Sequence, residues 1–145
     1  MFVTNNDARK FPNLKIGKEM ENFKFDKILC DVPCSGDGTL RKNNILWKTF
    51  HAHLGHSLHA LQLDILIRGL DLLKKGGYMT YSTCSFNPIE NEAVVQAALS
   101  HFKGKVELVS LKSLISPHLK CRPGMIKWRV YHKQKSRSHP AAWYT

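Results

Sequence analysis

Two short apolar runs, at residues 27–32 and 78–83, constrain the fold of this chain more than any other feature of its sequence. Runs of this length without alternation are typical of strands that are buried on both faces of a parallel sheet. Residues 57–75, between the runs, carry leucine and isoleucine at helical spacing, and Gly76 and Gly77 are expected to stop this helix. A strand, a helix and a strand in this order predict a parallel pair joined by a crossover.

A second helix is expected after the later apolar run. Asn87 can cap this helix, Pro88 suits its first position, and Glu90 can reach back to the cap as in a capping box. We expect the helix to reach about residue 101, with a polar connection at residues 9–26. Strands are also expected at 106–109 and 126–131, and a strand end at 2–3. This alternation predicts an α/β fold with a parallel sheet.

A cysteine follows each apolar run, Cys34 the first and Cys84 the second, and Asp31 stands at the end of the first run. The carboxyl ends of neighbouring parallel strands meet at one edge of the sheet, where open α/β sheets bind their ligands. We therefore expect both thiols in one cleft. A single cysteine at a strand end is more often a small buried hydrophobe, and an aspartate before a turn is often a turn residue. The indication comes from the three residues together.

The charge of the chain is uneven. Its formal net charge is +11, but residues 1–100 carry 12 lysines and arginines against 10 acidic residues. Residues 101–145 carry 10 lysines and arginines against Glu107 alone, interleaved with aromatic residues such as Trp128 and Tyr131. Cations that contact phosphates and rings that stack on bases suit a nucleic acid, and a solvated basic tail is the alternative interpretation.

Several classes of protein and site are disfavoured. The four cysteines are too sparse for the disulfide framework of a small secreted scaffold. Cys30 and Cys34 have no second close pair, and no Cys, Asp or Glu lies among the histidines at 51–59, so no metal site is expected. No run approaches the roughly 18 apolar residues of a membrane span. The first residues lack a signal peptide, so an intracellular protein without membrane contact is expected.

Two cysteines and an aspartate suit one reaction in particular. Carbon-5 of cytosine is too weak a nucleophile to take a methyl group directly, but a thiolate that adds to carbon-6 makes carbon-5 reactive. A site for this reaction needs a nucleophilic cysteine, an acid–base group, a partner for the polar edge of the ring and a bound methyl donor. The residues at the two strand ends supply most of these groups.

The motifs around the cysteines point to one family. DVPCSGDGT at residues 31–39 and YSTCS at 81–85, followed by NPIENE at 87–92, resemble two signature motifs of the Sun family of RNA cytosine carbon-5 methyltransferases. LRKN at 40–43 and RPGMIKW at 122–128 resemble its eukaryotic tRNA-modifying branch. The resemblance implies a Rossmann-like class I fold that depends on S-adenosylmethionine, with RNA, tRNA in particular, as substrate. It also implies a protein of the nucleus or nucleolus, with the cytoplasm as the alternative.

The resemblance also assigns roles by position. Cys84 matches the nucleophile that bonds to carbon-6, and Cys34 matches the second cysteine, which assists release of the methylated RNA. Asp31 matches the acidic residue near both the methionine end of the donor and the target base, and Asp7 matches the acidic residue that contacts the adenine of the donor. DNA cytosine methyltransferases attack with a Pro-Cys thiol, so Cys34 as the attacking group is the rival assignment.

We expect the pKa of Cys84 to be lowered, because the helix that begins near Pro88 places its amino terminus close to the thiol. An alkylation rate that rises only around the ordinary thiol pKa of about 8.5 contradicts this hypothesis.

The sequence departs from the family in one respect. The Gly-rich loop for the donor, the acidic residue for its ribose and the catalytic lysine have no equivalent before Asp7. Residues 1–131 are therefore expected to be part of a catalytic domain, with the sheet's second half and an exposed apolar edge at 27–32, and residues 132–145 a basic extension. On this view the isolated chain binds S-adenosylmethionine poorly and is inactive. The alternatives are a non-catalytic RNA-binding fragment or pseudoenzyme, and a thiol redox protein, although no Cys-x-x-Cys is present.

Overall fold

The structure is a computed structural model that describes residues 2–17, 21–51, 53–111 and 116–129. The chain divides into two compact units, Met1–Glu107 and Leu108–Thr145. The basic extension expected at residues 132–145 lies outside the described residues. Both cysteine motifs belong to the first unit, which is therefore the one that positions the candidate site.

Two parallel strands form the sheet of the first unit. Strand β3 (Phe25–Asp31) pairs with β4 (Leu73–Ser82), and the register places Cys30 opposite Tyr81 and Asp31 opposite Ser82. The strands predicted at residues 27–32 and 78–83 are thus confirmed. Because the pair is parallel, the carboxyl ends of both strands lie at the same edge.

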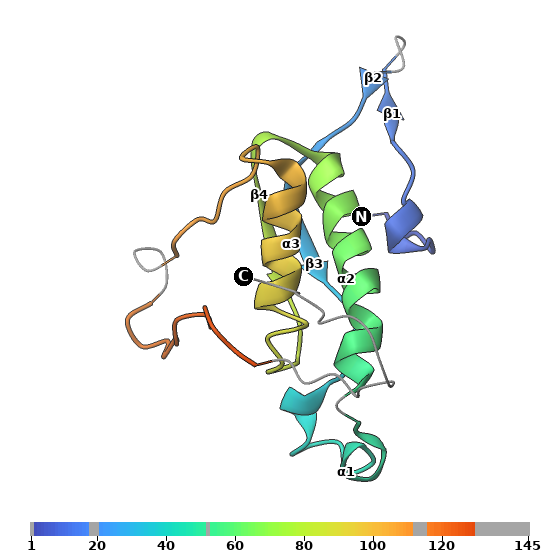
Figure 1. The fold of residues 1–145 in the computed structure, drawn as a ribbon. Coiled ribbons are helices and arrows are strands. Elements are labelled where there is room, and N and C mark those ends of the chain that lie inside the picture. Colours follow the sequence, from blue (N-terminus) through green and yellow to red (C-terminus); the bar gives the residue numbers. More distant parts are fainter. Residues whose placement is uncertain (1, 18–20, 52, 112–115, 130–145) are drawn as a thin grey trace, which may run out of the picture. The chain divides into compact units, whose positions relative to one another are not determined.

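Two helices cover one face of this strand pair. Helices α2 (His53–Leu72) and α3 (Glu92–Phe102) lie side by side in front of β3 and β4 (Figure 1). Their contact forms the core, in which Leu66, Val94 and Ala98 are buried. Further apolar side chains pack around this cluster: Leu63, Leu70, Met79 and Tyr81. Burial of one aliphatic side chain of this size contributes about 1.5–3 kcal/mol, so the helical stripes hold the helices to the sheet.

The boundary between α2 and β4 differs from the prediction. The helix was expected to continue to residue 75, but it ends at Leu72 and the strand begins at Leu73. Lys74 lies in the strand, where its ammonium group is 2.7 Å from the carboxylate of Asp26. A cation at a helix end and a cation opposite an acid across two strands look alike in sequence, and here the strand pairing prevails.

The opposite face of the sheet is open among the described residues. Leu29 is 75% exposed and Tyr78 is 61% exposed, although both stand in the two predicted buried strands. The prediction that these strands are buried on both faces is therefore wrong for the part of the chain that the structure describes. The helices cover the side to which Cys30 and Met79 point, and side chains alternate between faces along a strand.

The segment expected as a polar connection holds several short elements. A 3₁₀ turn η1 (Ala8–Lys10) precedes two short antiparallel strands, β1 (Lys15–Ile16) and β2 (Glu21–Asn22). The strand end expected at residues 2–3 is wrong, because Phe2 and Val3 are exposed and belong to no strand. Between β3 and α2 lie a second 3₁₀ turn, η2 (Asp37–Thr39), and the short helix α1 (Leu46–Thr49).

The second unit contains no helix or strand within residues 108–111 and 116–129. The strands expected at 106–109 and 126–131 are wrong for the positions that are described, and residues 130–131 lie outside them. An apolar run becomes a strand only when another strand completes its ladder of hydrogen bonds, which these residues lack. None of the helices in the described ranges is long and apolar enough to cross a membrane.

Candidate active site

The two cysteines lie against each other at the carboxyl edge of the sheet. The Sγ atoms of Cys34 and Cys84 are 3.2 Å apart, across 50 positions of sequence. Cys84 is exposed and Cys34 is half-buried. The topology of the parallel pair thus brings both thiols to one place, with Cys84 the more accessible of the two.

The backbones of the two cysteine loops are joined directly. The amide of Gly38 donates to the carbonyl oxygen of Cys84 at 2.9 Å, and the carboxylate of Asp37 accepts from the amide of Phe86 at 2.9 Å. A Cβ atom at Gly38 would lie 2.5 Å from that carbonyl oxygen, closer than atoms approach without a clash. Gly38 is therefore required for close approach of the loops, and not for flexibility alone.

A buried carboxylate joins the same two loops through side chains. Glu90 is fully buried and accepts hydrogen bonds from both residues that follow the cysteines. The donors are Ser35 N at 2.8 Å, Ser35 Oγ at 2.5 Å, Ser85 Oγ at 2.8 Å and Gln62 Nε2 at 3.1 Å. The carboxylate therefore ties the loop after β3 to the loop after β4.

This arrangement replaces the capping box expected at residues 87–90. Helix α3 begins at Glu92, and its cap residue Asn91 makes no side-chain cap hydrogen bond. Asn87 caps the preceding turn by accepting from the amide of Ile89 at 3.1 Å. The Glu90 side chain turns into the protein because the serine hydroxyls and amide offer it more donors than the cap amide does.

Glu90 is charged in this environment. Burial raises its pKa, but the hydrogen bonds from Ser35, Ser85 and Gln62 outweigh burial, and the net effect is a pKa below the usual value. A buried carboxylate that accepts several hydrogen bonds keeps its charge. The lowered pKa of Glu90 therefore follows from the number of hydrogen bonds that its carboxylate accepts.

The pKa of Cys84 is raised and not lowered. The main cause is the hydrogen bond with Cys34, followed by burial and by repulsion from the Cys34 sulfur, and Asp31 adds further repulsion. The expectation that this pKa is lowered is therefore wrong, and the neighbouring thiol is the largest cause of the rise. Burial raises the pKa of Cys30 to about 11, which leaves that thiol unreactive near neutral pH.

Asp31 lies at the last position of β3, beside the thiols. Its carboxylate is exposed and accepts from the hydroxyl of Ser82, the opposite residue in β4, at 2.8 Å. Its charge contributes to the raised pKa of Cys84, which places it within electrostatic range of that sulfur. The structure therefore groups Asp31 with Cys34 and Cys84.

Asp7 pairs with Arg9, and within the described residues it makes no hydrogen bond to that group. Its carboxylate accepts from the backbone and the guanidinium of Arg9, with the salt bridge at 2.6 Å. These hydrogen bonds lower the pKa of Asp7 to about 2. Asp7 caps η1, the 3₁₀ turn that contacts α2.

A cavity of about 400 Å³ lies between η1, α2 and the edge of β3. Its lining is mostly apolar, and Asp31 is its acidic residue. The other lining residues are Ala8, Phe11, Phe25, Lys27, Ile28, Leu29, Cys30, Ile65, Gly69, Leu72 and Met79. This volume and composition are within the range of small-molecule sites.

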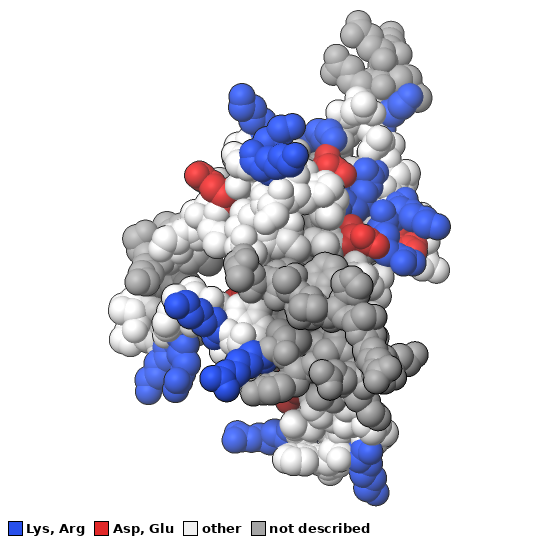
Figure 2. Space-filling model, in the orientation of Figure 1, with Lys and Arg blue, Asp and Glu red and all other residues white. Residues whose placement is uncertain are grey.

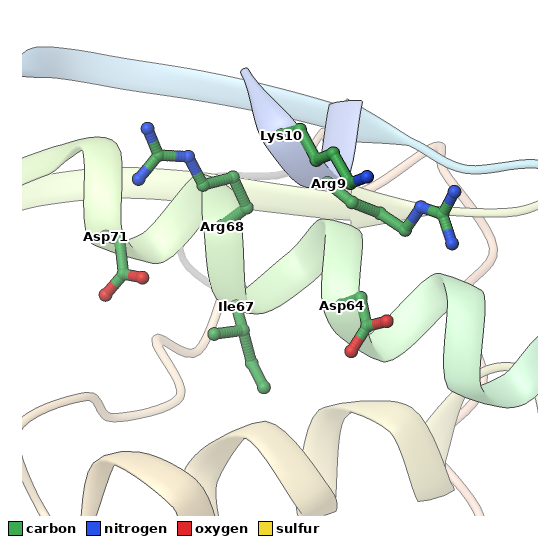
Figure 3. A pocket seen from close by; sticks show the side chains of 6 residues that line it. All are labelled: Arg9, Lys10, Asp64, Ile67, Arg68 and Asp71. Atoms are coloured by element: carbon green, nitrogen blue, oxygen red, sulfur yellow. The ribbon is translucent and has the colours of Figure 1, made fainter. Parts of the chain in front are cut away.

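A second cavity, of about 300 Å³, is lined by residues of η1 and α2 and is rich in charge. Figure 3 shows Arg9 and Lys10 above the helix and Asp64, Arg68 and Asp71 along it, with Ile67 between. Arg68 donates to the carbonyl of Phe11 and to Asn13 Oδ1. The cavity is lined by three basic and two acidic residues, and none of its lining residues belongs to the cysteine loops.

Basic side chains cover more of the visible surface than acidic ones do. In Figure 2, the blue of lysine and arginine appears at several separate places over the described atoms, and the red of acidic residues covers less. Within residues 2–17, 21–51, 53–111 and 116–129, no group of three His, Cys, Asp or Glu side chains could hold a metal ion.

Glu90, Ser35, Ser85 and Gly38 were not predicted as site residues. One signal was present in the sequence, because serine follows cysteine in both motifs. Both serines donate to the same carboxylate in the structure.

Comparisons with known proteins give consistent results. The sequence model of the family described as 16S rRNA methyltransferase RsmB/F matches residues 1–137. The chain is 52% identical over 141 residues to the multisite-specific tRNA:(cytosine-C(5))-methyltransferase trm4b of Schizosaccharomyces pombe, which covers 90% of this chain and 20% of that protein. It is 50% identical over 137 residues to the multisite-specific tRNA:(cytosine-C(5))-methyltransferase of Saccharomyces cerevisiae. This match covers 92% of this chain and 20% of that protein.

A third relative and a solved structure are also similar. The tRNA (cytosine(34)-C(5))-methyltransferase of Drosophila melanogaster is 48% identical over 137 residues, with 92% of this chain and 18% of that protein covered. A methyltransferase homolog protein from Pyrococcus horikoshii is 42% identical at a TM-score of 0.45, covering 55% of this chain and 24% of that one. The chain spans about a fifth of the length of the curated relatives it matches.

Proposed function

Because the chain belongs to the 16S rRNA methyltransferase RsmB/F family, we propose that the protein transfers a methyl group to carbon-5 of cytosine in RNA, with tRNA as the substrate class. The parallel β3–β4 pair and its two helices belong to an α/β fold, a partial Rossmann-like methyltransferase fold. The observation that carries the proposal is the thiol pair of Cys34 and Cys84, 3.2 Å apart at the carboxyl edge of the sheet.

Cys84 is proposed as the nucleophile. It is the more exposed thiol and lies at the carboxyl end of β4, where a base can reach it. Its thiolate forms a bond to carbon-6 of cytosine, and the electron pair displaced to carbon-5 then takes the methyl group. Removal of the carbon-5 proton returns that pair, and the carbon–sulfur bond breaks to release Cys84 as thiolate.

Cys34 is proposed to assist the release step. Its sulfur is 3.2 Å from Cys84, within reach of a proton that moves to or from the adduct. The same contact keeps a proton on the pair, because two thiolates at this separation repel. Cys34 is thus placed to exchange a proton with the nucleophile before attack and after release.

S-adenosylmethionine is the proposed donor and supplies an electrophilic methyl group when bound. Asp31 would hold its cationic methionine end, since that carboxylate is exposed at the rim of the 400 Å³ cavity beside β3. Asp7 would contact the adenine from the start of η1, whose residue Ala8 lines the same cavity. For Asp7 to accept from the adenine amine, its carboxylate has to share donors with Arg9.

The RNA has to present an unstacked cytosine. Unstacking costs a few kcal/mol and is least costly in loops, which favours a tRNA loop over a helix. The net charge of +11 suits a polyanion, and salt is expected to weaken binding.

A mechanism-based trap tests the proposal on the full-length protein. RNA that carries 5-azacytosine lacks the carbon-5 proton, so the adduct cannot be resolved and the protein stays attached. We expect a covalent complex whose cross-linked peptide contains Cys84. Cys84→Ala should abolish it, and Cys34→Ala should accumulate a stalled adduct with ordinary RNA.

Each other outcome has a defined meaning. A cross-link at Cys34 that survives Cys84→Ala reverses the two roles. RNA binding without adduct or methyl transfer contradicts the proposal and favours a non-catalytic RNA-binding protein.

A further inference from the structure

Both cysteines are followed by a serine, and both serines bind the same buried carboxylate. We propose that Glu90 is a positioning residue that sets the separation of the two thiols by holding Ser35 and Ser85 together. Its consequence for catalysis rests on the proposed function, whereas its consequence for the geometry of the thiols does not.

The hydrogen bonds converge on one carboxylate oxygen. Oε2 of Glu90 accepts from Ser35 Oγ at 2.5 Å and from Ser85 Oγ at 2.8 Å, and the two hydroxyl oxygens are 3.3 Å from each other. Each serine is joined by one peptide bond to its cysteine. An oxygen that fixes both serines therefore limits how far the cysteines can separate, consistent with their Sγ–Sγ distance of 3.2 Å.

Residues of α2 and β4 hold Glu90 through both its side chain and its main chain. Gln62 of α2 donates both to Glu90 Oε1 at 3.1 Å and to the carbonyl oxygen of Pro33 at 2.9 Å. Tyr81 of β4 donates its hydroxyl to the carbonyl oxygen of Glu90 at 2.6 Å. A Cβ atom at Gly55 would come within 2.9 Å of Glu90 Oε2, so α2 closes over the group. Glu90 is thus connected to α2 and β4 as well as to both cysteine loops.

A glutamine side chain reproduces this arrangement only in part. Four donor bonds reach the two oxygens of Glu90, two on each. Glutamine has one acceptor oxygen and one amide nitrogen, which only donates. Two of the four donors would therefore face the amide nitrogen in place of an oxygen. The serine hydroxyls could rotate to accept from that nitrogen while the amide oxygen accepts from Ser35 N and Gln62. These hydrogen bonds would lack the charge of the carboxylate and would therefore be weaker. Glu90→Gln is thus expected to loosen the pair while it preserves the volume of the side chain.

Small errors in position have large effects on rate. A displacement of about 1 Å between reacting groups can lower a rate about 100-fold. The nucleophile and its neighbour exchange a proton over 3.2 Å, so loosening their loops should slow chemistry more than RNA binding. A residue that only stabilised the fold would instead lower the fraction of folded protein and leave the rate of each folded molecule unchanged.

The experiment compares full-length wild type with Glu90→Gln and the control Glu107→Gln, which makes the same change at an exposed carboxylate. The first readout is the rate at which diamide oxidises the two thiols to a Cys34–Cys84 disulfide, diamide taking up the two electrons and two protons. The second readout is the adduct with 5-azacytosine RNA. The amplitude of adduct formation measures the fraction of protein molecules that are active. The rate constant measures how fast each active molecule reacts.

We expect Glu90→Gln to slow both disulfide formation and the adduct rate constant about 10- to 100-fold, with the RNA dissociation constant within twofold of wild type. The control should match wild type in all readouts. A milder variant, Ser35→Ala, removes one hydroxyl and keeps the backbone donor, so it should change both rates in the same direction by less.

The two proposals can fail separately. If Glu90→Gln and Ser35→Ala lower only the adduct amplitude or the melting temperature, with both rate constants unchanged, Glu90 is structural and the inference is overturned. If wild type forms no adduct but Glu90→Gln still slows the disulfide, the proposed reaction fails and the positioning role stands. If Glu90→Gln does not fold, Ser35→Ala decides by the same two rates.

Discussion

The sulfur of Cys34 lies 3.2 Å from the sulfur of Cys84, because two parallel strands end in register beside each other. Asp31 is opposite Ser82 at the last paired position, so the chains leave the sheet together. From there each strand needs only a few residues to bring its cysteine to the same edge. The separation of the thiols is thus set by strand register and by the loops that follow.

Mild oxidation should join these two cysteines selectively. Diamide is expected to produce one disulfide between Cys34 and Cys84, because no other pair of cysteines is in contact within the described residues. Peptide mapping by mass spectrometry under non-reducing conditions identifies the product. Cys84→Ser should leave no intramolecular cross-link, and a disulfide that contains buried Cys30 in the wild type would contradict the geometry.

The pH dependence of alkylation tests the neighbouring-thiol effect on Cys84. Cys34 raises the pKa of Cys84, so iodoacetamide should modify Cys84 with a midpoint above the ordinary thiol value. Cys34→Ala removes the largest cause and should move the midpoint down. The modified Cys84 peptide is quantified by mass spectrometry from pH 6 to pH 11. A midpoint below that of a free thiol in wild type would instead support activation by the helix terminus.

Gly38→Ala should separate the two loops. The new Cβ would clash with the carbonyl oxygen of Cys84 at 2.5 Å, and relief requires one loop to move. Such overpacking costs about 1–3 kcal/mol of unfolding free energy, measured by urea denaturation. The diamide disulfide should also form more slowly.

Gly76→Ala is the matched control for that change. Gly76 has a φ of 78° and nothing within 4 Å of the added methyl, so it tests backbone conformation without a clash. We expect some loss of stability and an unchanged rate of disulfide formation. Equal slowing in both variants would show that general destabilisation, and not loop separation, is responsible.

The ion pair of Asp7 should be visible in a titration. Arg9 lowers the pKa of Asp7 from 3.8 to about 2. The folded pKa lies below the unfolded one, so this contact stabilises the fold above pH 3.8 and loses its effect as the pH falls through about 2. Carbon-detected NMR of the carboxyl group measures the value, and Arg9→Ala should raise it towards 3.8, while the backbone hydrogen bond from residue 9 remains.

The central elements were predictable because their signals are local. Apolar runs bounded by breakers gave β3 and β4, and leucine periodicity gave α2. The end of α2 was misplaced because Lys74 suits either a helix end or a partner of Asp26, and only the folded chain has Asp26 nearby. The strand predicted at 106–109 was wrong for a similar reason. A strand needs a partner strand, and no local sequence pattern specifies that partner.

The site was predictable only in part. The thiols and Asp31 could be placed at one edge from topology alone, before any distance was known. Glu90 was assigned to a helix cap, where its spacing fits equally well. Its actual role depends on donors 55 and 28 positions away, Ser35 and Gln62, which become neighbours only when the strands pair. The direction of a buried carboxylate is a tertiary property.

Because one carboxylate bonds to both cysteine loops, the segments 31–39 and 81–92 depend on each other structurally. A change beside one thiol is transmitted to the other through Glu90 and its serines. A chimera that takes only one of these segments from a distant relative should therefore lose the thiol contact, whereas one that takes both should keep it. The two motifs are far apart in the sequence, but they can be exchanged between relatives only together.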